Sequence, residues 1–209
     1  MRRTSLCLIL GVSLLWAGFA VAAPPQLKGE YAFTGEASCL VAIAGFKEDL
    51  TPIVINPSDP YDKVFSNSFS VQGVRTFDGN GKGTVEGILV TTVPRPTPSS
   101  PGRHFPPDAS SNSFSFQFTY KFAEDGTITS QMVPGSFIGT FLTGPRTGQT
   151  YTVDQFTLSG MASKDNKVLT LATPTTEVET HTYFDVNGDI LDVWPSICHR
   201  SRVLIWLGE

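Results

Sequence analysis

The stretch SFSFQFTYKF, residues 113–122, decides the fold class of this 209-residue chain. Every second residue in it carries an aromatic ring, namely Phe114, Phe116, Phe118, Tyr120 and Phe122. Alternation with a period of two is typical of a β-strand that has one buried and one solvated face. We therefore predict a strand here whose five rings point inward, where they either line a ligand-binding lumen or fill the interior.

Turn sequences extend this strand into a series of hairpins. Glu124-Asp125-Gly126 forms a tight reversal after it, and residues 127–133 are predicted to return beside it. The same combination of alternating residues and turns predicts further strands at residues 30–44, 65–77, 84–93, 137–143, 149–161, 167–173, 177–184 and 197–207. Because hairpins follow one another and no segment shows a helical period, we expect an antiparallel meander of nine or ten strands.

The composition is that of a single β-rich domain. The chain has 15 Phe, 19 Gly and 15 Pro, and only 16% of its residues are charged, so helix formers are few. We expect one domain over residues 23–209, with long proline-containing loops at 46–60 and 94–108. Such loops are either surface connections or a lid over a binding site.

Residues 1–22 are typical of a secretory signal peptide. Arg2 and Arg3 precede an almost wholly apolar run over residues 6–20, and Ala20-Val21-Ala22 forms a small-x-small cleavage site. A transmembrane anchor is the alternative, but the apolar run is short for a hydrocarbon core of roughly 30 Å. We therefore predict a Sec-type exported protein, secreted or periplasmic, that does not span the membrane once the signal is removed.

Cleavage leaves two of the three cysteines, Cys39 and Cys198. Because exported proteins meet oxidising conditions, we predict a disulfide between them. That bond would place the first and last strands side by side and close the meander into a barrel of about eight to ten strands. A β-sandwich, in which those strands pack face to face, is the alternative.

The charge of the chain disfavours one class of partner. The formal net charge is −4, and it becomes more negative when Arg2 and Arg3 leave with the signal peptide. An acidic surface does not suit binding to nucleic acid or to an anionic membrane.

Three short motifs resemble those of a broad set of uncharacterised secreted bacterial β-barrel proteins. They are LKGEYAF at residues 27–33, FDGNG at 77–81 and EDGTI at 124–128. All three are strand and turn sequences, so the resemblance implies the fold and the export but no activity.

The overall plan also resembles the lipocalins and other calycins, which are antiparallel barrels that hold small apolar ligands. In that group a glycine-x-tryptophan motif opens the first strand, and an arginine of the last strand packs over the ring. Gly29-Glu30-Tyr31 stands at the corresponding place, with tyrosine instead of tryptophan. The resemblance implies a barrel-closing contact of Tyr31 with Arg200 or Arg202.

One strand carries residues with catalytic or metal-binding chemistry. Glu177, Glu179 and His181 occupy alternate positions and therefore share a face. Two carboxylates and an imidazole so placed could bind a divalent metal or form an acid–base pair. The opposite face carries Val178 and Phe184, and we expect it to point inward, leaving the charged face in water. We therefore predict no catalytic residue, metal or cofactor.

Three function classes follow from this interpretation. The favoured one is a binding module whose barrel holds a small apolar ligand. The second is a structural or interaction protein of the cell envelope with a filled barrel. The third is a barrel isomerase or cyclase, which would need polar side chains pointing inward among the aromatic rings.

Overall fold

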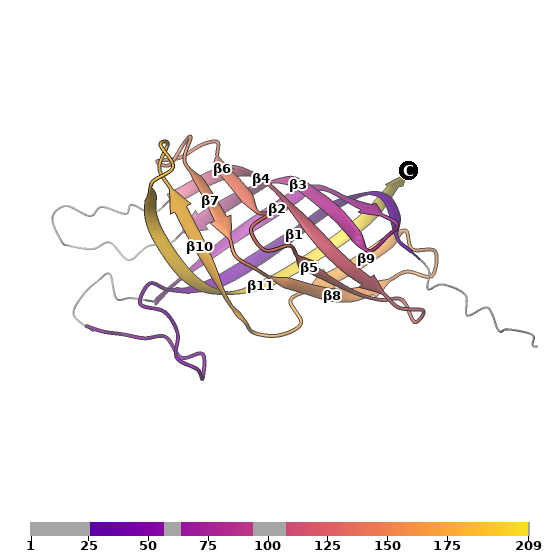
Figure 1. Cartoon of the computed structure of the whole chain (residues 1–209), viewed down its shortest axis with the longest axis horizontal. Helices are drawn as coiled ribbons and strands as arrows, with labels where there is room; N and C mark the ends of the chain where they lie inside the picture. The colour runs from indigo at the N-terminus through magenta and orange to yellow at the C-terminus, as the bar shows by residue number, and fades with distance from the viewer. Residues whose placement is uncertain (1–25, 57–63, 94–107, 209) are drawn as a thin grey trace, which may run out of the picture.

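The computed structural model describes residues 26–56, 64–93 and 108–208 (Figure 1). The predicted signal peptide, residues 1–22, lies outside the described residues. So do part of the predicted loop at 46–60 and nearly all of the loop at 94–108. Within the described ranges, no helix has the length and apolarity of a membrane span.

Eleven strands make up the described part of the chain, and every pair of neighbours is antiparallel (Figure 1). They are β1 (Lys28–Ala42), β2 (Val64–Asp78), β3 (Lys82–Val93), β4 (Asp108–Phe122), β5 (Thr127–Met132), β6 (Ile138–Phe141), β7 (Thr150–Val153), β8 (Thr157–Ala162), β9 (Val168–Ala172), β10 (Val178–Phe184) and β11 (Ile190–Gly208).

The strands close into a ring because β1 pairs with both β2 and β11. Eight strands form this ring, in the order β1-β2-β3-β4-β5-β8-β9-β11. The long strands β4 and β11 each have room for two partners, so a second route between them runs through β6, β7 and β10. The wall is therefore continuous along the barrel, with β5-β8-β9 at one end and β6-β7-β10 at the other (Figure 1). The predicted fold class is confirmed.

Three predicted strands differ markedly from those observed. β4 begins at Asp108, five residues before the predicted strand at 113–122. The stretch 149–161 is not one strand, because the chain breaks between β7 and β8 at Asp154. The Asp154 carboxylate accepts backbone hydrogen bonds from Gln155 at 2.7 Å and from Thr180 at 2.8 Å, which replaces regular pairing at this point. The last strand begins at Ile190 rather than at residue 197, since it continues through Pro195, which pairs with Thr180.

Interior glycines make room for aromatic rings across the strand. Gly83 and Gly87 on β3 lie opposite Phe118 and Phe114 on β4. A Cβ atom on Gly83 would lie 2.4 Å from the Phe118 ring, which is far inside van der Waals contact. The large rings of β4 thus fit within a ring of eight strands only because glycine faces them.

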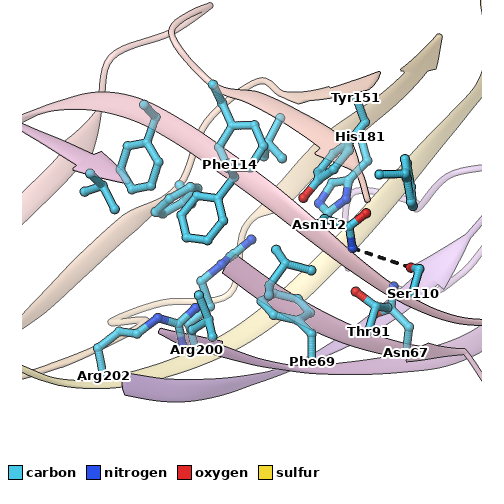
Figure 2. A pocket seen from close by; sticks show the side chains of 18 of the residues that line it. Asn67, Phe69, Thr91, Ser110, Asn112, Phe114, Tyr151, His181, Arg200 and Arg202 are labelled. Carbon is cyan, nitrogen blue, oxygen red and sulfur yellow. Dashed lines mark hydrogen bonds between the residues drawn. The ribbon is translucent and has the colours of Figure 1, made fainter. Parts of the chain in front are cut away.

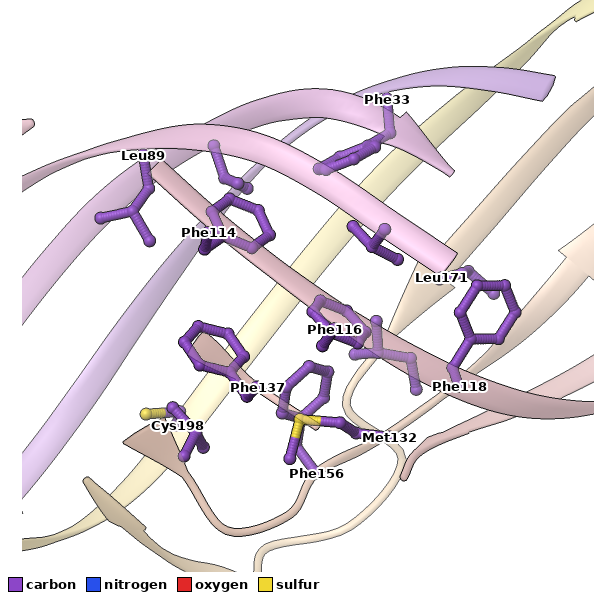
Figure 3. Close-up of a cluster of buried hydrophobic side chains, with 14 of the residues drawn as sticks. Phe33, Leu89, Phe114, Phe116, Phe118, Met132, Phe137, Phe156, Leu171 and Cys198 are labelled. Atoms are coloured by element: carbon purple, nitrogen blue, oxygen red, sulfur yellow. The ribbon is translucent and has the colours of Figure 1, made fainter. Parts of the chain in front are cut away.

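The buried apolar side chains form one cluster inside the barrel (Figure 3). At one end of the barrel, aromatic rings of this cluster pack directly against one another. Phe77 and Phe118 meet edge to face with their ring centroids 5.2 Å apart. The Tyr120 hydroxyl donates a 2.6 Å hydrogen bond to the carbonyl of Leu27. Ile128, Met132 and Leu169 complete this end and are almost wholly buried.

Cys39 and Cys198 are paired in the register of β1 and β11, and they form the predicted disulfide. The bond therefore joins the first and last strands of the ring. A disulfide is compatible with an extracellular or periplasmic protein. Because the two residues are 159 positions apart, the chain-entropy contribution is about 5 kcal/mol at most.

The double variant Cys39→Ala/Cys198→Ala should keep the fold but lower the free energy of unfolding by about 2–5 kcal/mol, because the unfolded chain regains its freedom. Urea titration of the variant and of the wild type measures this difference. Peptide mapping without reductant should find the two cysteine peptides linked. Two free thiols in the protein purified from its own host would contradict the disulfide.

Candidate functional site

The barrel encloses a cavity of about 100 Å³ next to the packed end. Ten aromatic side chains line it, including Phe33, Phe69, Phe137 and Trp194. A void of this size holds several water molecules or part of a small organic molecule. Asn67 and Arg75 both line it from β2, eight residues apart, so the residues that line it span roughly 26 Å of that strand at about 3.3 Å per residue.

The polar face of β10 points into the barrel. Glu179 is 1% exposed and His181 is 8% exposed, whereas Val178 on the other face is only half-buried. The expectation that Val178 and Phe184 point inward and leave the charged face in water is therefore wrong. Glu177 lies apart from the other two, because its carboxylate accepts a 3.0 Å hydrogen bond from the backbone N–H of Thr157.

Arg200 on the neighbouring strand explains why a carboxylate is tolerated inside. Its guanidinium donates a hydrogen bond to Glu179 Oε1, and His181 Nε2 lies 2.6 Å from the same oxygen. Burial by itself would raise the pKa of Glu179. The charge of Arg200 and the hydrogen bond to His181 outweigh it and lower that pKa to about 2. The Arg200 guanidinium also lies 4.5 Å from the centroid of the Phe156 ring.

Arg75 on β2 is a buried charge of a different kind. It is 4% exposed, and its Nη1 has no hydrogen-bond partner among the described residues. Its Cζ lies 4.1 Å from the centroid of the Phe118 ring, at the border between the cavity and the packed end. Burial lowers the pKa of Arg75, and no described acidic group offsets this. A desolvated cation–π contact contributes about 2 kcal/mol, less than the several kcal/mol that burying an ion costs.

Two further arginines line the same cavity. Arg202 follows Arg200 on the inner face of β11 (Figure 2). Its Nη1 donates a 2.6 Å hydrogen bond to the carbonyl of Glu36. Burial, and after it the charges of Arg200 and Arg75, lower the pKa of Arg202. Arg146 lies 3.3 Å from the Asp192 carboxylate. The interior around the cavity is therefore electropositive.

The other end of the cavity carries neutral polar groups (Figure 2). Asn67, Thr91, Ser110 and Asn112 lie together there, and Asn112 Nδ2 is 3.5 Å from Ser110 Oγ. The amide oxygens of Asn67 and Asn112 are buried without a hydrogen-bond partner in the described part of the chain. Unpaired buried oxygens of this kind are costly unless water or a ligand reaches them.

The aromatic strand divides between the cavity and the packed core. Phe114 and Phe116 line the cavity, whereas Phe118 and Tyr120 belong to the packed end and Phe122 is only partly buried against it. Two of the five aromatic residues predicted to point inward therefore line the cavity.

The barrel-closing contact that the calycin resemblance implies does not form. Tyr31 lies opposite Trp206 in the register of β1 and β11, several residues away from Arg200 and Arg202. Its ring packs edge-on against Phe77 with centroids 5.2 Å apart. Arg200 instead holds the buried carboxylate in the barrel interior.

Sequence reasoning missed Arg75, although the pattern held a signal for it. Phe69, Val71 and Phe77 define the apolar face of β2, and Arg75 is in phase with them. A charged residue on the apolar face of a strand indicates a buried ion.

The described residues offer no preformed metal site of the usual kind. The one group of potential ligands with suitable spacing consists of Glu179 and the two disulfide cysteines. Since the sulfurs of Cys39 and Cys198 are bonded to each other, neither is available as a thiolate ligand.

No protein-family model matches the chain, and a comparison with curated protein sequences finds no match. The two resemblances that the motifs suggest therefore stay predictions.

The wild-type protein should lose about 3 kcal/mol of stability as the pH falls from 4.5 towards 2. The folded-state pKa of Glu179 is depressed, so its contribution is complete above the ordinary value of 4.5 and disappears as the carboxylate is protonated. Urea titrations at a series of pH values measure the slope of the free energy of unfolding against pH. Glu179→Gln should remove that part of the slope and lower stability at pH 7 by about 3–5 kcal/mol.

Glu124→Gln, in an exposed turn, is the matched control and should keep the wild-type slope. An unchanged acid slope in Glu179→Gln would show that the buried ion pair does not govern acid stability.

Proposed function

We propose that the protein is an exported binding module that holds a small, largely apolar ligand in its interior cavity. One observation carries this proposal: a cavity walled by aromatic rings lies inside the barrel, within a large cluster of buried apolar side chains. Ligand sites are typically concave and apolar, with a few polar groups that fix the orientation of the ligand. The rings of Phe114 and Phe116 supply apolar wall, and Arg75, Asn67 and Asn112 supply the polar groups.

The unsatisfied polar atoms argue against a barrel that is filled only for stability. Asn67 Oδ1, Asn112 Oδ1 and Arg75 Nη1 are all buried without partners among the described residues. Apolar residues of similar size at these positions would remove the desolvation cost of each group, which is about 1–3 kcal/mol or more. Their presence is explained if a ligand or ordered water completes their hydrogen bonds.

Filling the cavity should abolish binding without unfolding the barrel. Val71 lines the cavity and is 4% exposed, whereas Val90 on the adjacent strand is 50% exposed. Val71→Phe should weaken binding of the neutral probe decanamide by roughly tenfold or more, and Val90→Phe should leave it unchanged. Isothermal titration calorimetry measures both, and circular dichroism checks the fold.

Native mass spectrometry of the wild-type protein, purified gently from the organism that makes it, should show a bound small molecule that is lost on denaturation. A clean apo mass, together with no binding of decanamide, would contradict the binding proposal and favour a filled barrel that acts through its surface.

A barrel isomerase or cyclase is the second candidate, and one observation favours it. His181 lines the cavity and its Nε2 atom lies 2.6 Å from Glu179 Oε1, so a histidine oriented by a carboxylate adjoins the cavity. This is the arrangement of a general acid–base pair. The inward polar groups that an enzyme requires are therefore present.

The small molecules that co-purify with wild type and with His181→Gln should separate the two functions. A binding module should carry the same compound in both proteins. An enzyme should carry product in the wild type and unconverted substrate, of equal mass if it is an isomerase, in the variant. Liquid chromatography with mass spectrometry distinguishes these outcomes.

A further inference from the structure

We propose that the ligand is an elongated amphipathic anion, and that Arg75 binds its acidic group. This inference rests on the proposed binding function and names the chemical class of the ligand. Its basis is a guanidinium that lines the cavity and lacks any partner of opposite charge in the described part of the chain.

The charge balance of the interior leaves Arg75 without a counterion. Glu179 is the only carboxylate among the buried residues of the described ranges. Its Oε1 atom already accepts hydrogen bonds from Arg200 and lies at hydrogen-bond distance from His181. A buried charge is stable only when it is paired and hydrogen-bonded. An anion that enters from outside would supply the partner that Arg75 lacks among the described residues.

The charge of the residues around the cavity is positive, whereas the net charge of the chain as a whole is negative. The formal net charge is −4, yet Arg75, Arg200 and Arg202 all line the cavity. A cationic ligand would meet this cluster at high electrostatic cost. An anion gains from Arg75 directly and from the field of the other two guanidinium groups.

The position of Arg75 determines how the ligand lies. Arg75 adjoins Phe118 of the packed end, so the cavity extends from it in one direction, past the rings of Phe114 and Phe116. An acidic group at Arg75 leaves the apolar body of the ligand against these rings. The far end, where Asn67 and Asn112 hold unpaired amide oxygens, accepts a hydrogen bond from a polar tail.

The structural alternative is that Arg75 serves only to pack over Phe118 and Phe77, from whose ring centroids its Cζ lies 4.1 Å and 5.9 Å away. Methionine fills similar space, contacts aromatic rings well and carries no charge. If Arg75 is kept for binding, Arg75→Met should raise the melting temperature of the ligand-free barrel by several degrees. If Arg75 is kept for packing, the melting temperature should fall.

The test compares decanoate with its neutral isostere decanamide, using calorimetric titration of the mature protein after bound ligand has been removed. The wild type should bind decanoate roughly tenfold or more tightly than decanamide. Arg75→Met should bind both compounds with equal affinity, since it keeps the apolar wall and loses the charge. Lys121→Gln, which removes one positive charge from the exposed face of β4, should keep the preference of the wild type.

Each outcome separates the two proposals. If the wild type binds neither compound, the binding function itself fails. If it binds both equally, the cavity binds ligands but the anionic class is wrong. If Arg75→Met keeps the preference for decanoate, another group holds the anion and the assignment to Arg75 is overturned. A variant that does not fold would likewise overturn it, because Arg75 would then be a structural residue.

Discussion

The pairing of β1 with β11 is the constraint from which the other properties of the barrel follow. An open meander of these strands would leave two unpaired edges and no enclosed interior. Once the ring closes, every inward side chain faces a space that is shielded from water along the whole wall. The bond between Cys39 and Cys198 lies on the inner face of this seam, within 4.8 Å of a Glu179 oxygen. The disulfide that links the first and last strands therefore lies beside the buried ion pair of Glu179.

In a closed interior, a polar group is stable only if it has a hydrogen-bond partner. The barrel contains buried polar groups with such partners and others without them. Glu179 belongs to the satisfied group, because Arg200 and His181 both contact the same carboxylate oxygen. Asn67 and Asn112 belong to the other group, with buried oxygens that have no described partner. Satisfied networks rigidify a fold, whereas unsatisfied groups next to a cavity indicate where something else binds. The second group is therefore the reason why our proposal places the function of the molecule at the cavity.

The parts of the fold that could be predicted from sequence are those with a local signal. The alternation in residues 113–122 and the turn at Glu124-Asp125-Gly126 determine a hairpin on their own, and the cysteine pair gives the closure. The inward face of β10 could not be predicted, because it depends on Arg200, which lies on another strand at a register that sequence does not reveal. The break at Asp154 likewise depends on a hydrogen bond from Thr180.

The two buried arginines form an internal comparison that isolates what is unusual about Arg75. Arg200 lies 4.5 Å from the centroid of Phe156, and Arg75 lies 4.1 Å from that of Phe118, so both have the same kind of aromatic contact. Arg200 nevertheless also has a carboxylate, Glu179, supplied by the adjacent strand. At Arg200 the barrel thus provides a buried guanidinium with both an aromatic ring and a carboxylate. Arg75 also lines the cavity but has no such carboxylate among the described residues, and on this difference rests our proposal that Arg75 is a binding group rather than a packing group.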